Sequence, residues 1–127
     1  MTVRVRGLDH LVLVCTDVER SLSWYCEELG LAGVRVDEWR RGEAPFPSVR
    51  VDDHTIIDLV AGDRSGVNMD HVCLVVAPTD LAALARSGRF EVVGRGAVDG
   101  LFGAQGYATS LYVKDPDGNT VELRHYG

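Results

Sequence analysis

Long apolar runs and a surplus of positive charge are both missing from this sequence of 127 residues. No stretch approaches the roughly 18 apolar residues that a membrane span needs, and the start of the chain lacks the apolar core of a signal peptide. Lysine and arginine number 13 against 19 acidic residues, so the net charge is −6. Nucleic acids and anionic membranes attract basic surfaces, which makes both poor partners for this chain. The sequence therefore predicts a cytoplasmic protein.

Cysteine is scarce and shows no pairing pattern. Cys15, Cys26 and Cys73 are odd in number, form no C-x-x-C motif and fall inside apolar runs. We therefore expect buried, reduced thiols. A composition of 46% hydrophobic and 25% charged residues is ordinary for a globular protein, and this length suits one domain with its own core.

What the chain does contain is an internal repeat. The segment LDHLVLV at 8–14 returns as MDHVCLV at 69–75, and the offset is 71 − 10 = 61 residues. The strand that carries Asp58 returns as the strand that carries Glu122, and the offset is 122 − 58 = 64. Fixed-period similarity indicates a duplicated supersecondary unit. We predict a single domain over 1–127, with module one at about 7–61, a linker at 62–68 and module two at about 69–125.

The first module reads as one helix among strands. The apolar run 8–15 predicts a strand, and Thr16 with Glu19 forms the capping box of a helix that ends at Gly30. Its expected buried stripe is Val18, Leu22, Tyr25 and Leu29, and Trp24 is also expected in the core. Strands are expected at 34–40, 48–52 and 55–60. The pair Arg40-Arg41 predicts either a solvated strand end or a docking point for an anionic substrate.

The second module repeats this plan. Thr79 is the expected cap of a helix that buries Leu81, Leu84 and Ala85 and stops at Gly88, before a strand at 90–93. The glycine-rich stretch 94–106 predicts a loop, either at the rim of a site or as a surface connection. Strands at 109–114 and 120–124 flank the sequence Asp115-Pro116-Asp117-Gly118-Asn119, which predicts a hairpin turn.

Strand alternation decides which side chains share a face. It groups His10 with Leu8, Val12 and Val14, and His71 with Cys73 and Val75. It also groups Asp58 with Ile56 and Val60, and Glu122 with Thr120 and Arg124. Each half thus carries a histidine on its opening strand and an acid on its closing strand.

With these repeated segments and the closing hairpin, the chain resembles the vicinal oxygen chelate superfamily. That superfamily includes glyoxalase I, methylmalonyl-CoA epimerase, fosfomycin-resistance proteins, extradiol dioxygenases and bleomycin-resistance proteins. The resemblance implies an α+β fold of two tandem βαβββ modules, which form a curved, cup-shaped mixed sheet with helices on the outer face. It also implies metal ligands on the first and last strand of each module, and a homodimer, because a second chain covers open sheet edges.

The resemblance places His10, Asp58, His71 and Glu122 on one concave surface. Two imidazoles and two carboxylates in an apolar cup are costly unless something binds them, and a divalent metal satisfies all of them. Zinc, nickel, iron, manganese and cobalt all accept this ligand set. Metal-binding relatives tend to carry Glu where this chain has Asp58, so two sets stay open: four residues, or only His10, His71 and Glu122.

The implied function is a metal-dependent lyase or isomerase of the glyoxalase type that acts on a small substrate. The metal binds two adjacent oxygens and acts as a Lewis acid, while Glu122 or Asp58 moves a proton as general base. Two alternatives are a metal-free small-molecule or antibiotic-binding resistance protein and an iron-dependent ring-cleaving dioxygenase.

Cys73 is expected in a pocket wall and His54 in solvent. Tyr112 and Arg124 neighbour the cup, and Arg124 pairs with either an anionic substrate or a surface acid.

Overall fold

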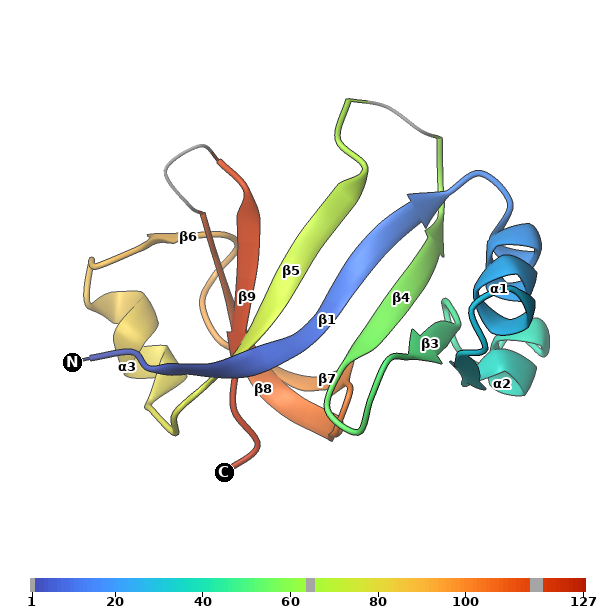
Figure 1. Ribbon diagram of the computed structural model, residues 1–127. Helices are drawn as coiled ribbons and strands as arrows, with labels where there is room; N and C mark the ends of the chain where they lie inside the picture. Colours follow the sequence, from blue (N-terminus) through green and yellow to red (C-terminus); the bar gives the residue numbers. More distant parts are fainter. Residues whose placement is uncertain (1, 64–65, 115–117) are drawn as a thin grey trace. The chain divides into compact units, whose positions relative to one another are not determined.

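The computed structural model describes residues 2–63, 66–114 and 118–127, with strands and short helices in a mixed α+β order (Figure 1). The predicted fold class is confirmed. In chain order the elements are β1 (Val5–Cys15), α1 (Val18–Glu27), β2 (Ala32–Val34), α2 (Val36–Arg40), β3 (Ser48–Arg50), β4 (Ile56–Ala61), β5 (Met69–Val76), α3 (Leu81–Arg86), β6 (Glu91–Val92), β7 (Val98–Gly103), β8 (Gly106–Lys114) and β9 (Thr120–Arg124). No helix among the described residues combines the length and apolar character of a membrane span.

The chain forms two compact units whose boundary falls inside β1. The N-terminal unit comprises residues 10–70, and the C-terminal unit comprises the residues up to Asp9 together with 71–127. In the C-terminal unit the backbone N–H of Ala77 donates to the carbonyl of Arg4 at 2.6 Å. The residues that precede His10 therefore pack with the second half of the sequence.

Parallel pairing of an opening and a closing strand organises the N-terminal unit. β1 runs parallel to β4, β4 is antiparallel to β3, and β3 is antiparallel to β2. Helix α1 packs on this sheet because its apolar side chains meet those of the strands. The buried cluster between them consists of Cys15, Val18, Leu22, Val49 and Leu59.

The C-terminal unit repeats the parallel pairing. β5 runs parallel to β9, β9 is antiparallel to β8, and both β6 and β7 pair antiparallel with β8. Its core joins the buried face of α3 to these strands and consists of Val76, Leu81, Leu84, Leu111, Val113 and Leu123. The expected hairpin is present, because Lys114 pairs with Thr120 and Tyr112 with Glu122. The predicted turn residues Asp115, Pro116 and Asp117 lie outside the described residues.

Both helix caps lie one residue later than predicted. Asp17, and not Thr16, caps α1, because its side chain accepts from the backbone N–H of Arg20 at 3.0 Å. Asp80, and not Thr79, caps α3 through the N–H of Ala83 at the same distance. A threonine beside an aspartate is ambiguous in sequence, since both residue types cap helices well.

The α1 cap can be tested by substitution. Asp17→Ala is expected to lower the free energy of unfolding by about 1 kcal/mol, because one backbone donor of the first turn loses its acceptor. Thr16→Ala is the matched control, and its change should stay within about 0.5 kcal/mol. Urea unfolding of both variants measures the difference. Equal losses in the two variants would contradict the assignment of the cap.

The predicted buried stripe of α1 is shorter than expected. Val18 and Leu22 are buried, whereas Trp24 is 52% exposed and Leu29 is 54% exposed. The helix ends at Glu27, so Leu29 no longer follows helical spacing. The expectation that Trp24 belongs to the core is wrong, and its ring instead packs edge-on against Tyr25 with centroids 4.9 Å apart.

The segment expected as a strand at 34–40 is mostly a helix. After β2, Arg35 takes a left-handed conformation with φ 56°, and α2 follows. Val36 and Trp39, which are three residues apart, both pack against the core of this unit. A spacing of three places them on one helical face, so this segment buries its apolar side chains as a helix and not as the expected strand.

The glycine-rich stretch also contains regular structure. We expected a loop at 94–106, but Val98–Gly103 forms β7 and pairs with β8, with a register shift between Val98 and Leu101. Gly103 pairs with Gly106 across a turn of two residues. The glycines thus serve a tight hairpin and an irregularity in the strand, and their number alone did not indicate a loop.

Candidate functional site

In the N-terminal unit the fold brings His10 and Asp58 together. They lie on neighbouring parallel strands, where Val12 is the residue that pairs with Asp58. His10 Nε2 is 3.8 Å from Asp58 Oδ2, and each residue is 2% exposed. The hydroxyl of Ser48, directly opposite Asp58 on β3, donates to Asp58 Oδ1 at 2.5 Å. The unit therefore presents a buried imidazole beside a buried carboxylate.

The C-terminal unit builds an equivalent pair from His71 and Glu122. His71 lies on β5, Glu122 lies on β9, and Cys73 is the residue that pairs with Glu122. His71 Nε2 is 3.1 Å from Glu122 Oε1. In both units the histidine lies two residues before the partner of the acid. The sequence repeat is thus also a repeat of strand register.

Each acid also has a serine that sequence reasoning missed. Ser48 donates to Asp58, and the hydroxyl of Ser110 on β8 donates to Glu122 Oε2 at 2.7 Å. The two serines are 110 − 48 = 62 residues apart, which falls between the repeat offsets of 61 and 64. The sequence therefore held a usable signal for both.

Arg124 pairs with a buried acid, whereas the sequence left an anionic substrate or a surface acid as its expected partner. It is 0% exposed, and its Nη2 donates to Glu122 Oε2 at 2.7 Å. Burial acts to lower the pKa of Arg124, but the charge of Glu122 and the hydrogen bond to it outweigh burial, so the pKa is raised above its ordinary value. Arg124 therefore stays cationic and remains with Glu122.

Two tyrosines lie next to Glu122 and Arg124. The rings of Tyr112 and His71 meet edge-on with centroids 5.5 Å apart. Burial, and after it the negative charge of Glu122, raises the pKa of Tyr112 well above its ordinary value. Burial and a hydrogen bond to Asp9 raise the pKa of Tyr126 to about 12. Both phenols therefore stay protonated at neutral pH.

Asp9 extends this arrangement to the start of the chain. Its Oδ2 accepts from the hydroxyl of Tyr126 at 2.5 Å, and its Oδ1 accepts from the backbone N–H of Ala104 at 2.9 Å. Asp9 is 0% exposed, whereas Asp70, its counterpart in the repeat, is exposed. We name the connected set Glu122, Arg124, Tyr126, Asp9 and Ser110 the Glu122 network.

The remaining candidates take the following places. Cys73 and Cys15 are buried and Cys26 is partly exposed, and all three are free thiols, so the expected burial holds for two of them. His54 is exposed, as expected. Cys73 lies on β5 two residues from His71.

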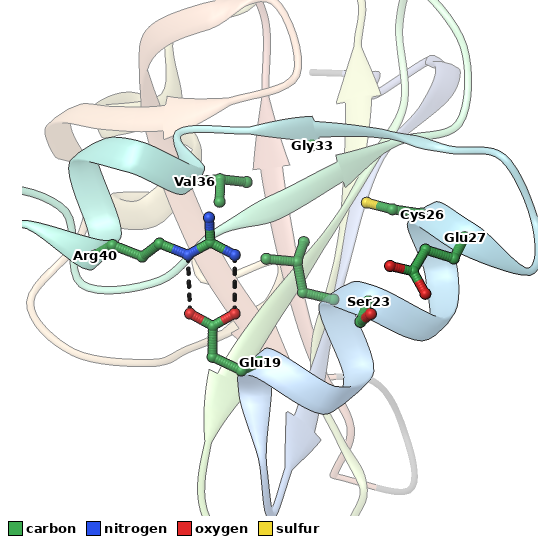
Figure 2. A pocket seen from close by; sticks show the side chains of 8 residues that line it. Glu19, Ser23, Cys26, Glu27, Gly33, Val36 and Arg40 are labelled. Carbon is green, nitrogen blue, oxygen red and sulfur yellow. Dashed lines mark hydrogen bonds and ion pairs between the residues drawn. The ribbon is translucent and has the colours of Figure 1, made fainter.

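Arg40 has a protein partner. Its Nε and Nη2 donate to the two carboxylate oxygens of Glu19 at 2.9 Å each, and Figure 2 shows this pair joining α2 to α1. The adjoining hollow has a volume of about 430 Å³ and is also lined by Cys26 and Gly33. Because Glu19 already engages both ends of the guanidinium fork, Arg40 serves to join the helices.

The two imidazole–carboxylate pairs have the chemistry of metal ligands or of proton carriers. Neutral imidazole and carboxylate oxygens are common ligands of divalent transition metals. A buried carboxylate next to a histidine can also accept and return a proton. Among the described residues these pairs lie at the four positions that the sequence singled out.

Comparisons with known proteins agree with this fold. The chain is 29% identical to the glyoxalase domain-containing protein RDO1 of Mycosarcoma maydis over 133 residues, which covers 96% of this chain and 69% of that protein. Its fold matches methylmalonyl-CoA epimerase from Mycobacterium tuberculosis at a TM-score of 0.69 and 20% identity, covering 100% of this chain and 92% of the other. It also matches the Mn(II)-bound glyoxalase from Novosphingobium aromaticivorans at a TM-score of 0.68 and 18% identity, covering 98% of this chain and 40% of the other.

A family model assigns the chain more directly. The model of the Glyoxalase/Bleomycin resistance protein/Dioxygenase superfamily matches residues 7–123, which span both units and include all four candidate residues. The resemblance seen in the sequence is therefore confirmed, and the chain belongs to the Glyoxalase/Bleomycin resistance protein/Dioxygenase superfamily.

Proposed function

We propose that this chain is a divalent-metal-dependent lyase or isomerase of the glyoxalase type, with His10, Asp58, His71 and Glu122 as the metal ligands. The observation that supports it is the repeated pair, in which each unit holds a histidine next to a buried acid in the same strand register. A buried carboxylate is costly unless it is paired, and a histidine together with a cation satisfies it. The donor set fits zinc, nickel, iron, manganese or cobalt.

The two proposed carboxylate ligands, Asp58 and Glu122, have different roles. A bound divalent ion would supply Lewis-acid stabilisation of negative charge on a substrate that carries two adjacent oxygens. Asp58 is held by a neutral donor, the Ser48 hydroxyl, whereas Glu122 is held by the Arg124 cation. A carboxylate held by a cation is the weaker base, so we assign proton transfer to Asp58 and charge balance to Glu122. The substrate class is a small molecule, and the working form is a homodimer.

Metal content tests this proposal. The protein, purified without a polyhistidine tag, should bind about one divalent ion per complete ligand set, and His71→Ala should bind markedly less, because it lacks one of the four proposed ligands. His54→Ala is the matched control, since that histidine is exposed and should change nothing. Light scattering on the same samples measures the oligomeric state.

Three results would contradict the proposal. Near-zero metal in the unaltered protein and in His71→Ala alike would favour the metal-free binding protein. Equal metal in the unaltered protein and in His71→Ala would exclude His71 as a ligand. A loss in His54→Ala as large as that in His71→Ala would show that binding is not specific to the repeated pairs.

A further inference from the structure

The two oxygens of Glu122 have different surroundings. Oε2 accepts from Ser110 Oγ at 2.7 Å and from Arg124 at both Nη2, at 2.7 Å, and Nε, at 3.2 Å. Oε1 lies 3.1 Å from His71 Nε2. The carboxylate is therefore held with one oxygen toward Arg124 and the other toward His71.

Arg124 is itself fixed on every side. Its Nη1 donates to the Leu101 carbonyl at 3.3 Å and to the Tyr126 hydroxyl at 3.1 Å. Its Nη2 also donates to the Phe102 carbonyl at 3.2 Å. Together with the bonds to Glu122, each N–H of the guanidinium has an acceptor, and the side chain is 0% exposed. A cation held this way cannot turn away from Glu122 without leaving a buried donor unpaired.

Gly103 provides the space that this arrangement needs. A Cβ at position 103 would overlap the Arg124 Nη1 atom and the Tyr126 hydroxyl, and it would lie 2.8 Å from Arg124 Cζ. The atoms it would meet are the ends of two long side chains, so the backbone can keep its course while the guanidinium moves. A single methyl group at position 103 therefore displaces Arg124 without changing any charge.

We propose, on the basis of the metal site above, that Arg124 is a positioning residue that limits Glu122 to one-oxygen coordination. Because Arg124 and Ser110 engage Oε2, Glu122 presents Oε1 alone on the side of His71. A carboxylate that bound through both oxygens would occupy an additional position on the ion. Restricting it to one oxygen keeps that position for a substrate, which the proposed function requires to chelate through two adjacent oxygens.

The test uses two variants that take the guanidinium of Arg124 away from Glu122. Gly103→Ala displaces it, and Arg124→Met removes it. Mn²⁺ affinity is measured by calorimetry, and Co²⁺ binding is followed by visible absorption, which weakens as the coordination number rises. We expect about 10-fold weaker Mn²⁺ binding, the lower end of what the loss of an outer hydrogen-bonding partner costs. We also expect weaker Co²⁺ absorption in both variants, because Glu122 becomes able to bind through both oxygens.

Two controls separate positioning from general stability. Leu84→Ala opens a cavity in the core of the same unit, in a cluster that includes no member of the Glu122 network, and should lower the melting temperature while leaving Mn²⁺ affinity and the Co²⁺ spectrum unchanged. Gly7→Ala adds a methyl group where no atom lies within 4 Å and should change nothing. All titrations are made below the melting temperature of each variant.

Each outcome decides the inference. Unchanged affinity and spectrum in Gly103→Ala and Arg124→Met would overturn it while the metal site stands. Losses of the same size in Leu84→Ala would overturn it as well, because they would follow stability. No Mn²⁺ or Co²⁺ binding by the unaltered protein would overturn both the inference and the proposed function. Spectral change confined to Gly103→Ala and Arg124→Met supports the positioning role.

Discussion

Glu122→Ala is expected to lower the free energy of unfolding by about 3–5 kcal/mol, the range for breaking a buried ion pair by removing one partner. The loss of stability comes from Arg124, whose buried charge no longer has its carboxylate partner. Arg124 is 0% exposed, and without Glu122 the acceptors of its guanidinium among the described residues are neutral, namely two carbonyls and the hydroxyl of Tyr126. Urea unfolding in the presence of EDTA measures the loss, since the chelator removes any contribution from bound metal.

The matched control removes both charges. The double variant Glu122→Leu/Arg124→Met should be far more stable than Glu122→Ala, because apolar residues that replace a whole buried ion pair are often tolerated. The single variants Glu122→Leu and Arg124→Met, together with the double variant and the unaltered protein, form a cycle that yields the coupling energy of the pair. A loss of less than about 1 kcal/mol in Glu122→Ala would contradict this account, since it would mean that Arg124 finds water or another partner at little cost.

Asp58→Ala is expected to weaken metal binding by at least about 10-fold, equivalent to roughly 1.4 kcal/mol. Asp58 is 2% exposed, lies 3.8 Å from His10 Nε2 and is oriented by Ser48. An alanine at this position removes a carboxylate that the proposed four-residue set needs. Asp53→Ala is the control for charge, because Asp53 is an exposed acid on the same connection into β4.

This result also separates reaction classes. If Asp58→Ala keeps its full metal content, the ligand set reduces to His10, His71 and Glu122. Two histidines and one carboxylate with open positions suit iron and oxygen chemistry. Activity that then requires both iron and oxygen would favour the ring-cleaving dioxygenase over the proton-transfer enzyme.

The strands that carry the candidate residues could be predicted because their signal is local and occurs twice. Alternation fixes which side chains share a face, and the repeat relates His10 to His71 and Asp58 to Glu122 from the sequence alone. This grouping needed only sequence spacing and the pleat of a strand. The repeated register, in which both histidines lie two residues before the partner of the acid, comes from the structure.

Other features depend on contacts that spacing does not reveal. α2 forms where Val36 and Trp39 meet the core and where Arg40 reaches Glu19, which lies 21 residues earlier. β7 forms because β8 offers it a partner, although glycines alone favour loops. Asp9 and Tyr126 are 117 residues apart, so their hydrogen bond follows from the fold and not from any motif.

The boundary within β1 has a consequence for dividing the protein. The sequence repeat separates near the linker at 62–68, but the compact units separate between Asp9 and His10. A fragment that begins at His71 would lack the carboxylate that accepts from Tyr126 and Ala104, and also the carbonyl of Arg4 that accepts from Ala77. The boundaries of the sequence repeat and of the compact units therefore differ by the first part of β1, residues 5–9, which belongs to the C-terminal unit. A circular permutant that joins residue 127 to residue 1 and opens the chain in the linker keeps the C-terminal unit contiguous, whereas simple scission in the linker does not.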